Sequence, residues 1–391
     1  MKVLIWDKSC SLKEMGGPIG YMWNIKEYLK DNPCTEITFY SDIMGDVHPE
    51  NTTPRSSLFR KTVTFFEKSS LIALLLFLYR MFYKSRILNT IDRQIVSGFD
   101  YVHFHIIQAY YPISKDSCLK GKSIITTHTP EPFIDELFKV YNANWILKYF
   151  PFIRKYLLKK EVNVYNRADY IMFPAKEAIE AYTNNIFFKN TLKNNKHKIF
   201  FVPTCVLDKK FPDYNEHDGK LRVCYIGRHN EIKGYDKLKD IARLAFSKNI
   251  DVEFNIGGKE GPLFRLEDAN WKELGWINTI QVLSEMDAFI LPNKDTYFDL
   301  IFLEVLRQGV PIIASNTGGN KFFRKYTNYQ LYFYDYADIG TAVSIINHLS
   351  SEKKQGHLVQ NRDSNRSLYL ENFTMKNYVI NYISELTKLH E

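Results

Sequence analysis

Short apolar runs, many of them β-branched, alternate along this chain with longer stretches of mixed polarity, and this alternation limits the possible folds most strongly. Strands that are buried on both faces of a parallel sheet have this composition, and the stretches between the runs are long enough for helices. In the first half of the chain the runs are residues 3–6, 37–40, 101–105, 123–127, 170–173 and 199–202. They predict a parallel, doubly wound α/β sheet.

A second series of runs follows a polar stretch, residues 209–220, that is rich in turn formers and has no periodicity. Its runs are residues 223–226, 252–256, 273–277, 288–291, 311–314 and 331–333. A chain of 391 residues is also longer than a single core usually supports. We therefore predict an N-terminal domain over residues 1–207 and a C-terminal domain over 208–371. Residues 372–391 have helical spacing, and we expect them to pack back toward the N-terminal domain.

The charge balance favours anionic partners, because 52 basic residues face 44 acidic ones and give a net charge of +8. Phosphorylated ligands and acidic lipid surfaces both fit this balance. The sequence has no zinc-finger spacing, basic heptad region or RNP pattern, so we expect no nucleic-acid partner.

The cysteines and the apolar segments indicate a cytoplasmic protein. The five cysteines are odd in number and scattered, which favours reduced thiols over a disulfide framework. The first apolar run is too short for a signal peptide and is interpreted as a buried strand. The longest apolar segment, residues 71–79, is shorter than the ~20 residues that a membrane-spanning helix needs.

Two segments combine aromatic and basic residues in the way that membrane-surface helices do. The first is residues 71–83, followed by Lys84 and Arg86, and the second is residues 145–160. Both suit a peripheral contact with the anionic inner face of a membrane, and with it a lipid-linked acceptor. The alternative, that both are core helices with solvated basic edges, stays open.

Two motifs of the second half contain candidate chemistry. Gly227 and Arg228 follow the run at residues 223–226, and Lys233 comes shortly after. Open α/β sheets bind ligands at the carboxyl ends of their strands, where fixed cations could stabilise a departing phosphate. Glu304 lies in a helix-like stretch that ends at Gly309, and its carboxylate could accept hydrogen bonds from ribose hydroxyls. Taken singly, the two cations could be surface residues and Glu304 a solvated glutamate.

Together, Gly227-Arg228, Lys233-Gly234 and residues 298–314 resemble the donor site of glycosyltransferase family 4 (glycosyl transferases group 1). The resemblance covers residues 3–382 and is most specific over 221–319. It implies the GT-B fold, with two Rossmann-like doubly wound parallel-sheet domains facing a central cleft. The donor-binding residues that it implies are Gly16, Gly17, Gly20, Gly227, Arg228, Lys233, Asp295, Thr296, Phe298, Asp299, Leu300 and Glu304.

The resemblance also extends to the first half of the chain. Gly16, Gly17 and Gly20 resemble the family's glycine loop, where backbone amides and a helix N-terminus face the phosphate or the acceptor. His128 stands where the family has a histidine that contacts the transferred sugar, so the implied catalytic residues are His128, Arg228 and Lys233. Without the family, His128 could equally be a strand-end histidine that the backbone satisfies. The neighbouring His103 and His105 are interpreted as structural.

The chain departs from the family pattern at three places. Thr296 replaces the first of two glutamates, Asp299 replaces a glycine, and Pro203-Thr204-Cys205 replaces a proline-asparagine-glycine turn. Because the missing glutamate normally faces sugar hydroxyls, these changes leave the donor sugar undetermined. We hypothesise that Asp295 or Asp299 takes its place.

The predicted function is that of a retaining glycosyltransferase of hexosyltransferase type. The enzyme would move a sugar from a nucleoside-diphosphate sugar to a hydroxyl of a glycan or lipid-linked glycan, in surface polysaccharide or glycolipid assembly. No Asp-x-Asp pair follows a strand, so we expect no metal and no cofactor besides the donor. The resemblance implies attack by the acceptor hydroxyl from the leaving-group side, with the departing phosphate taking its proton. The alternatives are a catalytically inactive GT-B subunit that is the partner of a true transferase, and a nucleotide-sugar epimerase.

Overall fold

The computed structural model describes residues 1–8, 10–14, 17–45, 70–82, 88–217, 219–258 and 260–391. The chain divides into two compact units. Unit 1 comprises Met1–Phe173, Ala181–Val202 and Tyr382–Glu391, and unit 2 comprises Pro174–Glu180 and Pro203–Asn381. Whether residues 1–207 and 208–371 are separate folding domains remains a prediction.

Unit 1 is built on a six-stranded sheet of order β2-β1-β3-β4-β5-β6, in which all neighbouring strands are parallel. The strands are β1 (Val3–Ile5), β2 (Ile37–Phe39), β3 (Tyr101–Phe104), β4 (Ser123–Ile125), β5 (Tyr170–Phe173) and β6 (Ile199–Phe201). Nearly all their residues are buried, as the apolar runs require.

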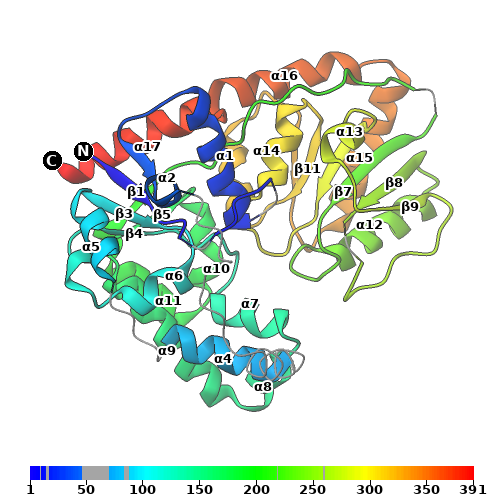
Figure 1. Cartoon of the computed structure of the whole chain (residues 1–391). Helices are drawn as coiled ribbons and strands as arrows, with labels where there is room; N and C mark the ends of the chain where they lie inside the picture. The colour runs from blue at the N-terminus through cyan, green and yellow to red at the C-terminus, as the bar shows by residue number, and fades with distance from the viewer. Residues whose placement is uncertain (9, 15–16, 46–69, 83–87, 218, 259) are drawn as a thin grey trace, which may run out of the picture. The chain divides into compact units, whose positions relative to one another are not determined.

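The helices of the first half lie between these strands along the chain (Figure 1). They are α1 (Gly17–Asp31), α2 (Tyr40–Met44), α4 (Ser70–Phe82), α5 (Thr90–Ser97), α6 (Ile107–Tyr110), α7 (Phe133–Val140), α8 (Asn144–Tyr149), α9 (Pro151–Arg167), α10 (Glu180–Thr183) and α11 (Ile186–Asn194). Short 3-10 turns lie at η2 (Tyr111–Ile113), η3 (Ser117–Leu119), η4 (Glu177–Ile179) and η5 (Lys196–Lys198). The end of α17 (Met375–His390) also belongs to unit 1, where Tyr382 is fully buried.

Unit 2 contains a second six-stranded parallel sheet, of order β12-β11-β10-β7-β8-β9. Its strands are β7 (Leu221–Ile226), β8 (Val252–Gly257), β9 (Trp271–Gly275), β10 (Ala288–Leu291), β11 (Ile312–Ser315) and β12 (Leu331–Tyr334). Its helices are α12 (Tyr235–Ser247), α13 (Thr279–Leu283), α14 (Leu300–Arg307), α15 (Ile339–Lys354) and α16 (Leu358–Asn372), with the 3-10 segment η6 (Gly318–Lys325).

The core of unit 2 lies where α12 and α15 cover the sheet (Figure 1). Leu238 and Ile241 of α12 and Ile346 of α15 are completely buried against Val223 and Phe254 of the strands. Residues three or four positions apart on these helices share this face, which is the helical spacing of a core-facing stripe. The structure therefore confirms the two parallel α/β sheets that the sequence predicts.

One predicted strand is displaced along the chain. The sequence places it at residues 273–277, but β9 is Trp271–Gly275. Trp271 is buried and stacks on Phe254 of β8 at 6.0 Å between ring centroids, so pairing begins two residues earlier. Gly275 then takes a φ of +67°, and Trp276, which was assigned to the strand, is 90% exposed.

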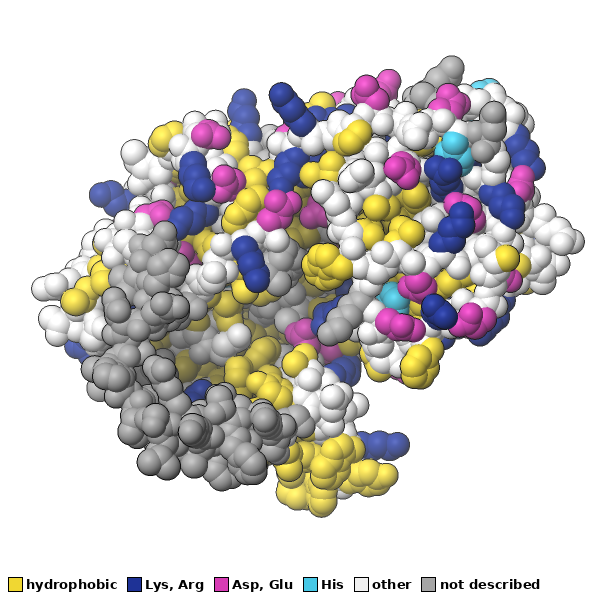
Figure 2. Space-filling view, turned by 45° about the vertical axis from the view of Figure 1, so that its right-hand side comes forward, with side chains coloured by type: hydrophobic (Ala, Val, Ile, Leu, Met, Phe, Trp, Pro, Cys, Tyr) yellow, Lys and Arg dark blue, Asp and Glu magenta, His cyan; other side chains and the backbone are white. Residues whose placement is uncertain are grey.

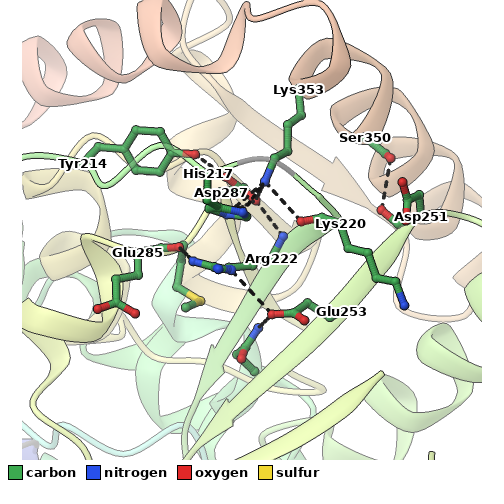
Figure 3. Close-up of polar contacts among 12 residues, drawn as sticks. Tyr214, His217, Lys220, Arg222, Asp251, Glu253, Glu285, Asp287, Ser350 and Lys353 are labelled. Carbon is green, nitrogen blue, oxygen red and sulfur yellow. Dashed lines mark hydrogen bonds and ion pairs between the residues drawn. The ribbon is translucent and has the colours of Figure 1, made fainter. Parts of the chain in front are cut away.

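A polar network fixes the segment before β7 to the amino end of the sheet in unit 2 (Figure 3). Its centre is Asp287, whose side chain is completely buried directly before β10. One carboxylate oxygen accepts hydrogen bonds from the Arg222 amide and from Lys353 Nζ, both at 2.7 Å, and the other accepts one from the Tyr214 hydroxyl. His217 Nε2 lies 3.3 Å from the same carboxylate. Tyr214, His217 and Arg222 are therefore held at the end of the sheet opposite to the carboxyl ends of its strands.

All five cysteines are free. Cys10, Cys34 and Cys118 are partly exposed and lie in unit 1, whereas Cys205 and Cys224 are buried and lie in unit 2. Among the residues that the structure describes, none of the helices is both long and apolar enough to cross a membrane.

Candidate functional site

Two loops of unit 2 meet at the carboxyl ends of β7 and β10, which are neighbours in the sheet. The Lys294 amide donates a hydrogen bond to the Ile232 carbonyl oxygen at 2.9 Å. Gly234 directly precedes α12 and has a φ of +66°, and a Cβ there would lie 1.6 Å from the carbonyl oxygen of Pro292. Only glycine permits this contact between the two backbones. Arg228 and Lys233 are thus held on one loop, and residues 295–299 on the loop beside it.

The backbone at Arg228 is fixed although its side chain is exposed. The buried Tyr225 hydroxyl donates a hydrogen bond to the Arg228 carbonyl oxygen at 2.9 Å. The amide of Gly227 donates to the Gly257 carbonyl oxygen at 3.0 Å. A guanidinium presented from a fixed turn at this sheet edge is well placed to meet an anion.

Lys233 forms an ion pair that the sequence did not predict. Its Nζ donates to both carboxylate oxygens of Asp299, each at 2.8 Å, and both side chains are largely buried. The Asn293 side-chain amide donates to the same carboxylate at 2.5 Å. Asp299 directly precedes α14, but its side chain makes no capping bond to the amides of that helix.

The other predicted donor residues of this loop differ in exposure. Thr296 is completely buried, and its Oγ1 has no hydrogen-bond partner in the described part of the chain. The Phe298 side chain packs against Phe323 at 5.0 Å between ring centroids, inside unit 2. Asp295, Leu300 and Glu304 are partly exposed; Leu300 is the first residue of α14, and Glu304 lies within it.

In unit 1 the predicted glycine loop forms the start of a helix. Gly16 lies outside the described residues, and α1 begins at Gly17. Gly20 lies in its first turn, and the Gly20 carbonyl oxygen accepts a hydrogen bond from the Asn24 side-chain amide at 2.7 Å. Next in α1, the ring of Tyr21 lies 4.6 Å from that of His128, so this helix and the loop after β4 come together.

His128 is in direct contact with a histidine that the sequence interpretation treats as structural. His128 has a φ of 57°, and its Nε2 shares a hydrogen bond with Nδ1 of the buried His105 at 3.0 Å. The buried His103 bonds to the Tyr382 hydroxyl at 2.7 Å and to Thr126 Oγ1 at 2.8 Å. Burial lowers the pKa of all three histidines, which are therefore neutral near pH 7. A neutral imidazole at His128 can exchange hydrogen bonds with a sugar hydroxyl.

Sequence reasoning missed Asn293 and Tyr225 as residues that hold the candidate groups in place. Asn293 could have been found, because it follows the run at residues 288–291 at the same sheet edge as Arg228. Tyr225 gave no such signal, because it stands in an apolar run and is typical of a core. No group of three or more His, Cys, Asp or Glu residues is arranged to hold a metal ion within the described ranges.

Residues 220–364, which lie within unit 2, match the family model "Glycosyl transferases group 1". A Klebsiella pneumoniae protein described as an uncharacterized 41.2 kDa protein in the cps region is 24% identical over 236 residues. That match covers 56% of this chain and 60% of the relative, so the chain spans less than two thirds of the relative's length.

Solved structures of low sequence identity share the fold. Sucrose-phosphate synthase from Thermosynechococcus elongatus matches with a TM-score of 0.61 at 14% identity, over 100% of this chain and 99% of that one. Anabaena Alr3699/HepE, solved with UDP and glucose, matches with a TM-score of 0.56 at 14% identity, over 99% of each chain. TarM matches with a TM-score of 0.52 at 15% identity, over 73% of this chain but only 54% of its own length. The two parallel-sheet α/β units have the GT-B fold.

Proposed function

We propose that this chain is a retaining, metal-independent glycosyltransferase that moves a sugar from a nucleoside-diphosphate sugar to a glycan or lipid-linked glycan. The observation that carries the proposal is the family match over residues 220–364, because it includes Arg228, Lys233 and Glu304. Two of these are the cations at the carboxyl end of β7, where open α/β sheets bind ligands. The Klebsiella relative in a cps region supports a part in surface polysaccharide assembly.

The proposal gives each candidate residue a role in binding or in transfer. Arg228 and Lys233 bind the diphosphate and stabilise the charge that develops as it leaves. Glu304 accepts hydrogen bonds from the ribose hydroxyls, and His128 contacts the transferred sugar. The acceptor hydroxyl attacks the anomeric carbon from the leaving-group side, and its proton passes to the departing phosphate, so configuration is retained. No cofactor besides the donor is required.

The first experiment is thermal unfolding of the chain with UDP, GDP, ADP and CMP. A ligand present at about 100 times its Kd adds about 2.7 kcal/mol to the stability of the state that it binds. We expect one base to stabilise the protein selectively, and Arg228→Ala to abolish that stabilisation. If none of the four nucleotides raises the unfolding temperature, the donor site is rejected.

We further propose peripheral attachment to an anionic membrane and a lipid-linked acceptor. The aromatic side chains of α8 and the start of α9 are exposed, with Tyr149 at 70% and Phe152 at 68%. Figure 2 shows apolar side chains gathered beside basic ones at the lower end of unit 1, where Figure 1 places α8. Lys148 and Lys155 stand among these aromatics in the sequence. This combination is typical of interfacial helices.

α4 contributes a second part of this surface. Its Leu74 is buried, but Leu75 and Tyr79 are each 57% exposed, so the helix is only half covered. Residues 83–87, which include Lys84 and Arg86, lie outside the described residues. A pocket beside α4 is lined by Ala73, Leu76, Phe77, Arg80 and Tyr141.

Co-sedimentation with vesicles tests the membrane proposal. We expect the chain to sediment with vesicles that contain anionic lipid at low salt, and Tyr149→Ser combined with Phe152→Ser to reduce the bound fraction. Failure to bind anionic vesicles at low salt would refute the attachment without affecting the donor site.

An inactive GT-B subunit is the second candidate, and two observations favour it. Thr296 occupies the position of the missing glutamate, and Lys233 is already neutralised by Asp299. Donor hydrolysis or transfer by the purified chain, lost in Arg228→Ala, would exclude this alternative.

A further inference from the structure

We propose that Asp299 is a built-in anion that competes with the donor's diphosphate for Lys233 and thereby lowers the affinity for the donor. The inference rests on the proposed function, because it concerns the same nucleotide site. It gives Asp299 a role different from that of the missing glutamate: the carboxylate acts on the cation rather than on the sugar.

The geometry of the pair supports this role. A carboxylate that receives two bonds from one ammonium group at 2.8 Å imitates the way in which a phosphate would engage Lys233. Only 20% of the Lys233 side chain and 16% of the Asp299 side chain are exposed, so water screens the pair less than an ion pair at the surface.

The Asp299 side chain also does not cap α14, although Asp299 stands directly before this helix. An aspartate directly before a helix usually accepts hydrogen bonds from the first amides of that helix. The Asp299 side chain makes no such bond to α14 and reaches Lys233 and Asn293 instead.

Two buried polar atoms in the same loop lack a hydrogen-bond partner within the described residues. Asn293 must present its amide nitrogen to the Asp299 carboxylate, which accepts but cannot donate. Its Oδ1 is therefore directed elsewhere, and within the described residues it is buried without a hydrogen-bond partner. Thr296 Oγ1 also has no hydrogen-bond partner within the described residues, and Asn293 and Thr296 are both completely buried. Buried polar atoms rarely remain unpaired, so ordered solvent should reach these two.

Donor binding would then require an exchange of partners. When the diphosphate engages Lys233, the Asp299 carboxylate loses its cation and faces a ligand of like charge. That cost is absent if residue 299 is neutral. We expect Asp299→Asn to bind the selected nucleoside diphosphate about tenfold more tightly, which corresponds to about 1.4 kcal/mol. The matching nucleoside, which carries no phosphate, should bind both proteins equally.

The experiment measures the affinities of nucleoside diphosphate and nucleoside for the wild type, Asp299→Asn, Lys233→Gln and the double variant. UDP and uridine are used first, and then GDP and ADP with their nucleosides. If Asp299 acts through Lys233, the gain from Asp299→Asn should disappear in the Lys233→Gln background. Asp240→Asn is the charge-matched control, because Asp240 pairs with Arg243 on the exposed side of α12. Asp299→Ser, a neutral residue that can also begin a helix, serves if Asp299→Asn does not fold.

The outcomes separate the inference from the proposed function. The built-in anion is supported if Asp299→Asn raises the affinity for the diphosphate but not for the nucleoside, and if this gain requires Lys233. This holds even if the wild type binds the diphosphate too weakly to measure. Nucleotide binding that is unchanged or weaker in both Asp299 variants overturns the inference alone. The inference alone is also overturned if Asp299→Asn loses sugar transfer while its affinity for the diphosphate is unchanged. Asp299 would then be a ligand of the sugar. No nucleotide binding to any variant rejects the donor site, and the inference with it.

Discussion

Arg228 is the residue whose role can be tested with the least risk to the fold, because its side chain is exposed while its backbone is held by Tyr225. Arg228→Ala should lower the rate of sugar transfer at least tenfold, about 1.4 kcal/mol or more of transition-state stabilisation, and leave the unfolding midpoint nearly unchanged. Steady-state kinetics with the donor of the selected base measures this. Arg243→Ala, an exposed arginine on α12, is the matched control. Wild-type turnover of Arg228→Ala would contradict its role.

The buried histidines of unit 1 predict a pH dependence of stability. Burial lowers the pKa values of His103 and His105 below the ordinary 6.5, so they stay neutral when the unfolded chain takes up protons. Below about pH 6.5 the unfolded state binds more protons, and stability therefore falls as the pH falls, by up to about 1.4 kcal/mol per pH unit for each histidine.

Urea unfolding between about pH 7.5 and about pH 5.5 measures this decline. His103→Gln keeps hydrogen-bonding groups for Tyr382 and Thr126 and should show a shallower decline than the wild type. The same slope in both proteins would show that His103 is protonated in the folded state.

At the level of elements, α9 supplies the cap that α7 lacks. Pro132 precedes α7 and offers no capping side chain, but the buried Glu161 of α9 accepts hydrogen bonds from the Phe133 and Ile134 amides at 2.7 and 3.0 Å. Burial raises the pKa of Glu161 to about 8, and the two amides act in the opposite direction.

Glu161→Ala should therefore lower the free energy of unfolding by about 2 kcal/mol, because two amides lose their acceptor. Glu161→Gln should cost less, since its carbonyl oxygen can still accept one bond. Urea unfolding of both variants measures the difference, with Lys159→Ala at an exposed position of α9 as the control. Equal stability of Glu161→Ala and the control would show that solvent caps α7 equally well.

The elements themselves were largely predictable because each buried parallel strand leaves an apolar run in the sequence. The error at β9 arose where an aromatic residue, Trp276, continued the apolar run after Gly275 had turned the chain outward. Side-chain partners were not predictable, because Lys233 and Asp299 are 66 positions apart and no local pattern links them. The sequence placed both near one sheet edge, but only the fold pairs them.

On the scale of the whole molecule, each unit builds its own candidate group at the carboxyl ends of its strands. In unit 2 the group contains Arg228 and Lys233, and in unit 1 it contains His128 after β4. The sequence pattern of two parallel sheets predicts one candidate group in each half of the chain, since ligands ordinarily bind at the carboxyl edge of such a sheet. The family match lies in unit 2, so its proposed roles have the broader support.

The distribution of thiols makes the two units chemically distinguishable in solution. Cys205 and Cys224 are buried, so a maleimide does not reach their thiols in the folded protein. The partly exposed Cys10, Cys34 and Cys118 all lie in unit 1. A maleimide dye should thus label unit 1 alone in the folded protein, as mass spectrometry of the digested product would show. Unit 1 could then carry a fluorescent reporter, without any engineered cysteine, while the nucleotide site of unit 2 remains unlabelled.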